Sequence, residues 1–270
     1  MSLWHRNKRA PHGASRIPSE KAFDFSPWTA LAASALPGDR RPHVADLRPG
    51  PIERGIALIL LLACSPLMLL VALAIKLDSP AGPIFYRQDR VGLNRRGQAL
   101  AGEEHAVESR DRRRPGAERR TTPGVGEVFR IYKFRTMVPD AEQTTGPVWA
   151  AAHDPRVTGV GALLRRSRLD ELPQLINIIQ GHMRLIGPRP ERPHFVQHLC
   201  VEIPDYPDRQ RVAPGITGLA QVEREYDSNV DAVRKKIMYD LFYVRNRCNL
   251  LDLKILLKTI DVMLRGRGAR

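Results

Sequence analysis

Residues 56–75 read IALILLLACSPLMLLVALAI and contain no charged side chain over 20 consecutive positions. At about 1.5 Å of rise per residue, a straight helix of this length would just cross a bilayer core about 30 Å thick. A buried helix of a soluble domain is the alternative, but such helices rarely remain uncharged for so long. We therefore expect residues 51–77 to form a helix that enters a membrane.

Two features of this stretch favour a helix that enters the membrane and returns to the same side. Pro66 lies at its midpoint and removes one helical hydrogen bond, so a kink is expected there, and the Ser65 hydroxyl could bond a carbonyl that the proline leaves without a donor. Both flanks are basic, with four arginines between residues 40 and 54, and one lysine and four arginines between residues 76 and 96. The positive-inside rule would keep both flanks in the cytoplasm, which predicts a re-entrant helix.

The whole chain is strongly basic. Its 270 residues include 43 Lys and Arg against 29 Asp and Glu, a formal net charge of +14. This excess favours a polyanionic partner, which could be nucleic acid, an anionic membrane surface or a phosphorylated substrate. No nucleic-acid-binding motif or aromatic stacking face supports the first of these, and the apolar stretch opposes it. We expect no nucleic-acid partner.

The distribution of residue types predicts three parts. Residues 1–50 are rich in Pro, Ser and Arg without periodicity, which predicts a disordered basic arm ahead of the membrane helix. Residues 78–270 are expected to form one compact α/β domain, mostly helical with a few short strands at about 84–87 and 129–137. Within this domain, residues 98–126 carry almost no large apolar side chain and predict a flexible insertion.

A pair of helices is predicted over residues 230–264. In its last part charged side chains recur on one helical face, and most of the remaining positions are Leu, Ile or Val. The charged positions are Lys254, Lys258, Asp261 and Arg265. Such an amphipathic helix either packs on the core or lies at a lipid interface.

The densest group of candidate catalytic residues is RRSRLDELPQLINIIQGHMRLIGPRPERP, residues 165–193. Asp170 and Glu171 are adjacent acids at a predicted helix start, where Pro173 suits the first turn. A helix start offers N–H donors that suit phosphate oxygens, but acids there are also typical of ordinary helix capping. The acids alone leave both interpretations open.

The surrounding arginines favour phosphate chemistry. Arg165 lies just upstream of the acids, and Arg189 is held between Pro188 and Pro190, which restrict the backbone that presents its guanidinium. Guanidinium groups match phosphate geometry with two donors. Acids beside such arginines indicate either a metal–diphosphate site or a carboxylate nucleophile that attacks phosphorus.

Several motifs, in this order, resemble the bacterial sugar transferases, the monotopic phosphoglycosyl transferases that start glycan assembly. The resemblance covers about residues 51–264 and leaves out the N-terminal arm and the insertion. Its motifs are the apolar Ser65-Pro66 segment, IKLDSPAGPIFYRQDRVG, YKFRTM, DPRVTGVGALLR, LDELPQLINIIQG, LIGPRPERP, APGITGLAQV, YDLFYVRN and LLDLKILLKTI.

The resemblance implies an enzyme that transfers a sugar 1-phosphate from a UDP-sugar to undecaprenyl phosphate and releases UMP. It also implies a requirement for Mg²⁺ and a role in starting exopolysaccharide, capsule, O-antigen or related glycans. A compact cytosolic catalytic domain would sit on the cytoplasmic face of the bacterial inner membrane, held in its lipid by the kinked re-entrant helix and by amphipathic interfacial helices. The sugar stays open, and so does a homodimer.

The resemblance also implies roles for particular residues. Asp170 would be the nucleophile that forms a covalent phosphosugar intermediate, Glu171 would be its acidic partner, and both would bind the metal. Other positions match family residues that hold phosphate or substrate near the active site. These are Arg165, Arg189, Lys133, Arg135, Pro188 and Pro190.

The sequence departs from the family pattern at three places. Glu53-Arg54-Gly55-Ile56-Ala57 stands where Lys-Arg-x-x-Asp is usual, and Gly181-His182-Met183-Arg184 stands where Gly-Asp-Met-Ser is frequent. Ala213 replaces a frequent arginine. These departures keep open a non-catalytic membrane scaffold of the same fold, although the Asp-Glu pair and the Gly-Pro-Arg-Pro segment are intact.

Overall fold

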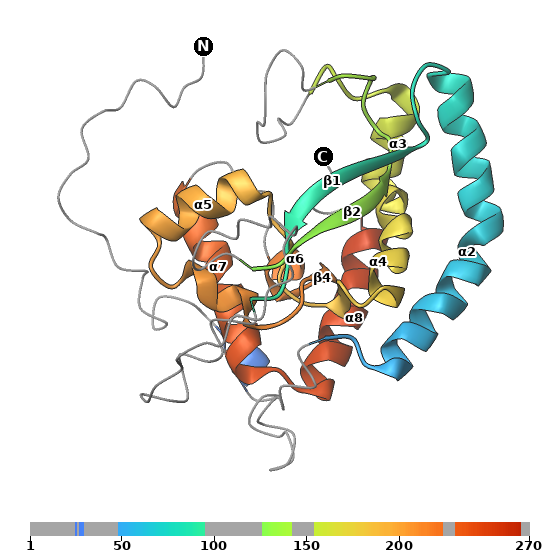
Figure 1. Ribbon diagram of the computed structural model, residues 1–270. Helices are drawn as coiled ribbons and strands as arrows, with labels where there is room; N and C mark the ends of the chain where they lie inside the picture. The colour runs from blue at the N-terminus through green and yellow to red at the C-terminus, as the bar shows by residue number, and fades with distance from the viewer. Residues whose placement is uncertain are drawn as a thin grey trace, which may run out of the picture.

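The computed structural model describes residues 25, 27–29, 48–94, 126–141, 154–223 and 230–265. Within these ranges the chain is mostly helical, with two small two-stranded sheets (Figure 1). The predicted class, mostly α with a few short strands, is confirmed. Nearly all of the predicted insertion and most of the predicted N-terminal arm fall outside the described residues.

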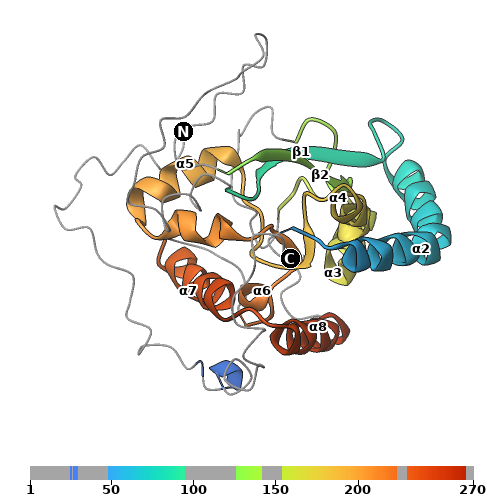
Figure 2. The same cartoon turned by 60° about the horizontal axis from the view of Figure 1, so that its bottom comes forward.

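Helix α2 (Pro51–Asp78) contains the whole apolar stretch. It runs through Pro66 without interruption, and its axis curves along its length at one edge of the molecule (Figures 1 and 2). Because Pro66 has no N–H, the carbonyl of Leu62 loses its helical donor. The hydroxyl of Ser65 donates to that carbonyl at 2.7 Å. The compensation expected from the sequence is present, while the return of the chain to one side of a membrane stays a prediction.

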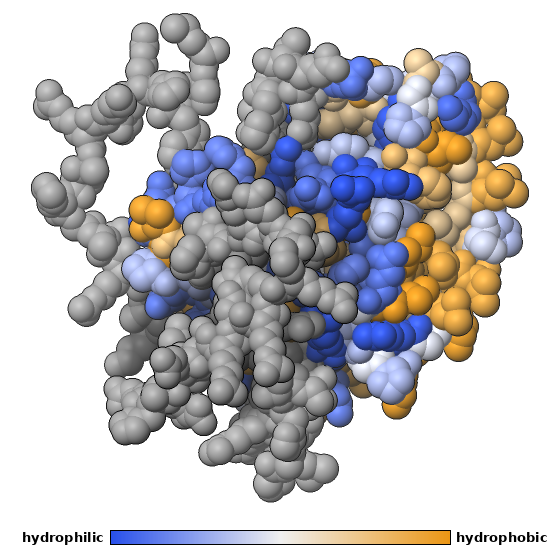
Figure 3. All heavy atoms as spheres, in the orientation of Figure 1, coloured by the Kyte–Doolittle hydropathy of each residue, from blue (hydrophilic) through white to orange (hydrophobic). Residues whose placement is uncertain are grey.

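Most of the apolar surface of α2 is uncovered by the rest of the described chain. Within the most apolar 18-residue stretch of α2, only 11% is buried by the described chain. Figure 3 shows the exposed side as a hydrophobic band along the edge that α2 occupies. Its most exposed members are Ile52, Ile59, Leu62, Leu69 and Leu77. This exposure does not fit the core helix of a soluble domain, whose apolar residues would be covered.

An antiparallel hairpin crosses the middle of the molecule (Figure 1). It consists of β1 (Phe85–Val91) and β2 (Val128–Phe134). Phe129 and Ile131 of β2 pack in one cluster with Ala57 of α2. The first strand is longer than predicted, and the second ends before residue 137.

Three short helical segments lie between this hairpin and α2. They are α3 (Gly159–Ser167), the 3-10 helix η6 (Leu169–Gln174) and α4 (Leu175–Ile179). Ile178 of α4 is fully buried beside Ala57, and Leu164 of α3 is buried with Val71 and Ile75 of α2. The inner side of α2 is therefore part of the core that carries η6.

The described residues nearest to the predicted insertion on either side lie next to each other at one end of the hairpin. The amide of Glu127 donates to the carbonyl of Leu93 at 3.0 Å, and the amide of Gly92 donates to the carbonyl of Glu127 at 2.8 Å. This arrangement is the one expected for a segment inserted into a single compact domain.

The remaining elements form the other half of the core. They are β3 (Arg184–Ile186), α5 (Pro193–Glu202), the 3-10 helix η7 (Tyr206–Arg211), β4 (Gly215–Thr217), α6 (Leu219–Glu223), α7 (Val230–Asn246) and α8 (Asn249–Leu264). Strands β3 and β4 pair in parallel, with Ile186 opposite Thr217. The predicted helical pair over residues 230–264 is confirmed.

Two aromatic residues of the predicted disordered arm are packed into this half of the core. The ring of Phe25 stacks on that of Phe242, with centroids 4.5 Å apart. Trp28 is only 2% exposed and lies beneath the ammonium group of Lys254, which is 4.6 Å from the ring centroid. At these two positions the predicted arm is packed against the core, and the disorder expected of residues 1–50 stays a prediction.

Helix α8 has apolar residues on two different sides. Leu251 and Ile255 are fully buried in the core, whereas Leu253, Leu257 and Ile260 are 50–60% exposed. Core packing therefore holds for one side of α8, and the exposed apolar side leaves its placement at a lipid interface a prediction.

Two departures from the family pattern meet where α2 begins. A carboxylate oxygen of Glu53 lies 3.0 Å from a guanidinium nitrogen of Arg184, and its other oxygen accepts a hydrogen bond from the amide of Leu185 at 2.7 Å. The guanidinium of Arg54 packs over Gly181, whose φ of +84° and lack of a Cβ permit this close approach. These contacts join the start of α2 to β3.

Candidate active site

Asp170 and Glu171 lie in the first turn of η6. Just before them, Arg168 ends α3 with a left-handed backbone, φ 60° and ψ 11°, which redirects the chain. This conformation is uncommon for a residue with a side chain and occurs often at functional sites. Both acids are buried, with 8% and 7% exposure. The predicted helix start is confirmed, although the helix is of the 3-10 type.

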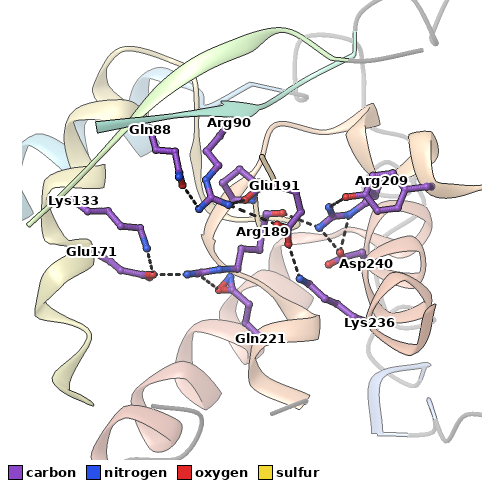
Figure 4. A network of polar contacts seen from close by, with 12 residues as sticks. Gln88, Arg90, Lys133, Glu171, Arg189, Glu191, Arg209, Gln221, Lys236 and Asp240 are labelled. Atoms are coloured by element: carbon purple, nitrogen blue, oxygen red, sulfur yellow. Dashed lines mark hydrogen bonds and ion pairs between the residues drawn. The ribbon is translucent and has the colours of Figure 1, made fainter. Parts of the chain in front are cut away.

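Glu171 is bound by two cations that come from distant parts of the chain (Figure 4). Its Oε1 atom accepts hydrogen bonds from Lys133 Nζ at 2.8 Å and from Arg189 Nη2 at 2.7 Å. Burial alone would raise the pKa of Glu171, but Arg189 and Lys133 outweigh burial and hold it well below its usual range. Glu171 is therefore ionised and fixed in place.

Asp170 has a different environment from its neighbour. Its closest cation is Lys133, whose Nζ is 4.0 Å from Oδ2, and no side chain in the described part of the chain donates a hydrogen bond to it. Burial raises the pKa of Asp170, Lys133 opposes this rise, and the charge of Glu171 adds to it. Adjacent carboxylates with opposite pKa shifts are typical of sites in which the two groups have separate roles.

Lys133 approaches both acids from β2. Its side chain is 16% exposed, and burial lowers the pKa of its ammonium group, while Glu171 opposes this shift. A buried ammonium between two carboxylates neutralises part of their charge, which favours the approach of an anionic phosphate.

Arg189 is oriented by two acceptors at its guanidinium end. Nη2 contacts Glu171, and Nη1 donates to Oε1 of Gln221 at 3.1 Å. The amide of the Gln221 side chain in turn donates to the carbonyl of Ile216 at 3.1 Å. The sequence motifs did not single out Gln221 as a site residue, and its distance of 32 positions from Arg189 leaves no local spacing signal.

The backbone beside Arg189 is held as well. The carbonyl of Pro188 accepts a hydrogen bond from the amide of Gly215 at 3.0 Å, and the carbonyl of Pro190 accepts one from Arg90 Nη1 at 3.0 Å. The two prolines therefore act through their backbone, by fixing the segment that carries the guanidinium.

Arg165 and Arg135, the other two arginines predicted to bind phosphate or substrate, have different partners. Arg165 donates from Nε to the hydroxyl of Thr136 at 2.9 Å, and its charge acts on Asp170. Arg135 is directed elsewhere, since its guanidinium donates to the hydroxyl and carbonyl of Ser79 and to the carbonyl of Pro83 at 2.6–2.8 Å. The structure brings Arg165 to the acids and places the Arg135 donors on the segment that follows α2.

A sequence model described as "Bacterial sugar transferase" matches residues 51–100 and 109–266. The chain belongs to the bacterial sugar transferase family. The interruption of the match at 101–108 falls inside the predicted insertion, and the matched ranges contain every site residue described above.

Two of three similar relatives of this sugar transferase are named for transfer of a sugar phosphate to undecaprenyl phosphate, and the third is named for exopolysaccharide production. It is 40% identical over 236 residues to the UDP-N-acetylgalactosamine-undecaprenyl-phosphate N-acetylgalactosaminephosphotransferase of Aeromonas hydrophila, covering 84% of this chain and 48% of that protein. It is 36% identical over 249 residues to the UDP-glucose:undecaprenyl-phosphate glucose-1-phosphate transferase of Caulobacter vibrioides, covering 89% and 79%. It is 34% identical over 214 residues to the exopolysaccharide production protein PSS of Rhizobium leguminosarum, covering 77% and 91%. The chain thus spans about half the length of the Aeromonas relative.

The acids of this sugar transferase offer a donor set that suits Mg²⁺. Among the described residues, no three His, Cys, Asp or Glu side chains form a ready-made metal cluster. Mg²⁺ commonly binds through one or two carboxylates together with substrate phosphates and water. Asp170 and Glu171 supply two adjacent carboxylates, so the residues present fit a Mg²⁺ ion that binds together with a diphosphate.

Proposed function

We propose that this sugar transferase moves a sugar 1-phosphate from a UDP-sugar to undecaprenyl phosphate, releases UMP, and thereby starts an exopolysaccharide or a related glycan. The names of the Aeromonas and Caulobacter relatives support the two substrates, and that of the Rhizobium relative supports the exopolysaccharide. The observation that carries the proposal is the contrast between the two buried acids. Glu171 is bound by two cations, whereas the carboxylate of Asp170 has no side-chain donor among the described residues.

In the first half of the proposed reaction, an oxygen of Asp170 attacks the phosphorus that carries the sugar. A bond forms between this oxygen and phosphorus, the bond from phosphorus to the UMP oxygen breaks, and UMP leaves with the electron pair. Lys133 and Arg189, which are held by Glu171, lie where they can neutralise the phosphate oxygens. Mg²⁺, when held by Asp170 and Glu171, supplies further neutralisation of the diphosphate.

In the second half, a phosphate oxygen of undecaprenyl phosphate attacks the same phosphorus. The bond to Asp170 breaks, the carboxylate is regenerated, and the sugar diphosphate remains on the lipid. A covalent intermediate allows the soluble nucleotide sugar and the lipid acceptor to use one site in turn.

The lipid acceptor requires the site to lie close to a membrane. The exposed apolar side of α2 (Figure 3) and the outward apolar residues of α8 supply surfaces that suit lipid. In the proposed arrangement α2 is re-entrant, with Ser65 and Pro66 at its kink, and the catalytic domain lies on the cytoplasmic face of the inner membrane.

The direct test is capture of the intermediate. Detergent-solubilised protein is incubated with Mg²⁺ and a panel of UDP-sugars, without lipid acceptor, and UMP and protein mass are measured. We expect one UDP-sugar to yield UMP and one phosphosugar per chain, sensitive to hydroxylamine and located on the LDELPQL peptide. Asp170→Asn should abolish both, because an amide does not attack phosphorus, while the exposed Asp89→Asn serves as the matched control. UMP release at the wild-type rate in Asp170→Asn would reject Asp170 as the nucleophile.

The alternative is an inactive scaffold of the same fold, which the departures from the family pattern left open. Glu53 and Arg184 pair with each other, and His182 stacks on Phe129 with ring centroids 5.7 Å apart. The residues that depart from the family pattern therefore make contacts within the fold, and these contacts do not favour the hypothesis of an inactive scaffold. A folded wild-type chain that yields neither adduct nor turnover with any UDP-sugar would favour it.

A further inference from the structure

A second group of buried charges lies behind Arg189, on the side away from Glu171 (Figure 4). Its centre is the ion pair of Arg209 in η7 with Asp240 in α7, whose side chains are 4% and 2% exposed. Arg209 donates to Oδ2 of Asp240 from Nη2 at 2.6 Å and from Nε at 2.9 Å, and from Nη1 to the hydroxyl of Tyr206 at 3.0 Å. The proposed phosphoryl transfer uses none of these groups.

The same guanidinium reaches the active-site segment. Nη2 of Arg209 also donates to the carbonyl oxygen of Arg189 at 2.8 Å. The carbonyls of Pro188 and Pro190 accept the hydrogen bonds described above, and the carbonyl of Glu191 accepts one from the amide of Val91 at 2.8 Å. Every backbone carbonyl from residue 188 to residue 191 therefore accepts a hydrogen bond. Among these bonds, the one from Arg209 acts on the residue whose side chain contacts Glu171.

A buried ion pair is weak support for stability, because the cost of removing two charges from water offsets their attraction. Apolar residues of similar volume are often as stable or more so. An apolar residue in place of Arg209, however, could not donate a hydrogen bond to the carbonyl of Arg189. A buried arginine has enough donors to meet Asp240, Tyr206 and this carbonyl together.

We propose that the Arg209–Asp240 pair is a positioning element that sets where the Arg189 guanidinium lies relative to Glu171. Asp240 and Tyr206 orient Arg209, Arg209 fixes the Arg189 carbonyl, and Glu171 with Gln221 fixes the other end of the side chain. The catalytic consequence of this inference rests on the proposed function, whereas its structural part does not.

The test separates position from stability with three variants in the full-length protein in detergent. Arg209→Met with Asp240→Leu replaces the pair by apolar groups, Arg209→Lys keeps the charge without the fork of donors, and Arg211→Met removes an exposed charge from the same short helix as the control. Melting temperature, kcat and KM for UMP release are measured for each. We expect the double variant and Arg209→Lys to melt near the wild-type temperature but to lose about 10-fold or more in kcat.

A second measurement follows Arg189 without turnover. Phenylglyoxal modifies accessible guanidinium groups, and Arg189, with 29% side-chain exposure, should react slowly in the wild type. We expect its modification rate, mapped by mass spectrometry, to rise severalfold in the double variant and to stay unchanged in Arg211→Met.

Two outcomes would overturn the inference. One is a folded double variant with wild-type kcat, and the other is an unchanged phenylglyoxal rate at Arg189. If the wild-type chain releases no UMP from any UDP-sugar, the proposed function fails, and the phenylglyoxal rates still decide whether the pair positions Arg189.

Discussion

Replacement of Arg189 by lysine should slow the proposed reaction strongly although it keeps the charge. The guanidinium contacts Glu171 at 2.7 Å through Nη2 and Gln221 at 3.1 Å through Nη1. A lysine ammonium can meet the carboxylate, but it cannot reproduce the two-pronged contact. Arg189→Lys should therefore lose about one charge-assisted hydrogen bond, worth about 1.5–3 kcal/mol.

This free energy corresponds to a measurable range of rates. Since about 1.4 kcal/mol is tenfold in rate, kcat/KM should fall by about 10- to 100-fold. The side chain is 29% exposed, so water can replace part of the lost contact and the smaller loss is expected. The assay is initial-rate UMP release with undecaprenyl phosphate present, and Arg130→Lys, with 61% side-chain exposure, is the matched control.

The role of Gln221 gives an internal check on this reasoning. Gln221→Met removes the same contact from the other side, so it should cost much less in an Arg189→Lys background than in the wild type. A fall in kcat/KM of less than about twofold in Arg189→Lys would refute the assigned contact, because it is smaller than the loss of one charge-assisted hydrogen bond would cause. An equal fall in the control Arg130→Lys would refute it as well.

Three further predictions follow from the same contacts. The kcat/KM profile against pH should have an acid limb above the usual pKa range of Asp, because in the proposed mechanism only ionised Asp170 attacks, and an acid limb at the ordinary Asp pKa would contradict this. Its alkaline limb should lie below the usual pKa range of Lys, and Lys133→Arg should shift that limb upward. Arg135→Met should lower the free energy of unfolding in urea by about 2–4 kcal/mol and leave KM for the UDP-sugar nearly unchanged in the folded protein. A large rise in KM without loss of stability would instead support the predicted role of Arg135 in substrate binding. With the native cysteines replaced by serine, Arg48→Cys and Asp89→Cys should both resist a membrane-impermeant thiol reagent added from the periplasm, and labelling of either would exclude a re-entrant α2.

Features with a local cause could be predicted from the sequence. The uncharged run predicts α2, and the missing N–H of Pro66 predicts the role of the Ser65 hydroxyl at Leu62. The helix start at Asp170 follows from the acids and the nearby proline. In each case the physical cause lies within about one turn of helix, so a short stretch of sequence contains it.

Features that depend on distant partners could not be predicted. Gln221 is 32 positions from Arg189, and Asp240 is 31 positions from Arg209. Each pair forms only after separate elements have packed, so neither spacing nor composition reports it. The same holds for Phe25, whose neighbours Pro and Ser indicate disorder although its ring stacks on Phe242 in α7.

The two cations of the YKFRTM motif show why a sequence match places a residue near a site without assigning its contacts. Lys133 and Arg135 are two positions apart and would share a face if β2 continued. The amide of Arg135 still donates to the carbonyl of Ile84 at 2.9 Å, but the next partner position, Pro83, has no N–H with which to extend the pairing. The guanidinium of Arg135 binds Ser79 and Pro83, just beyond α2. Lys133 thus contacts the acids, while Arg135 ties the segment that follows α2 to the end of the same strand.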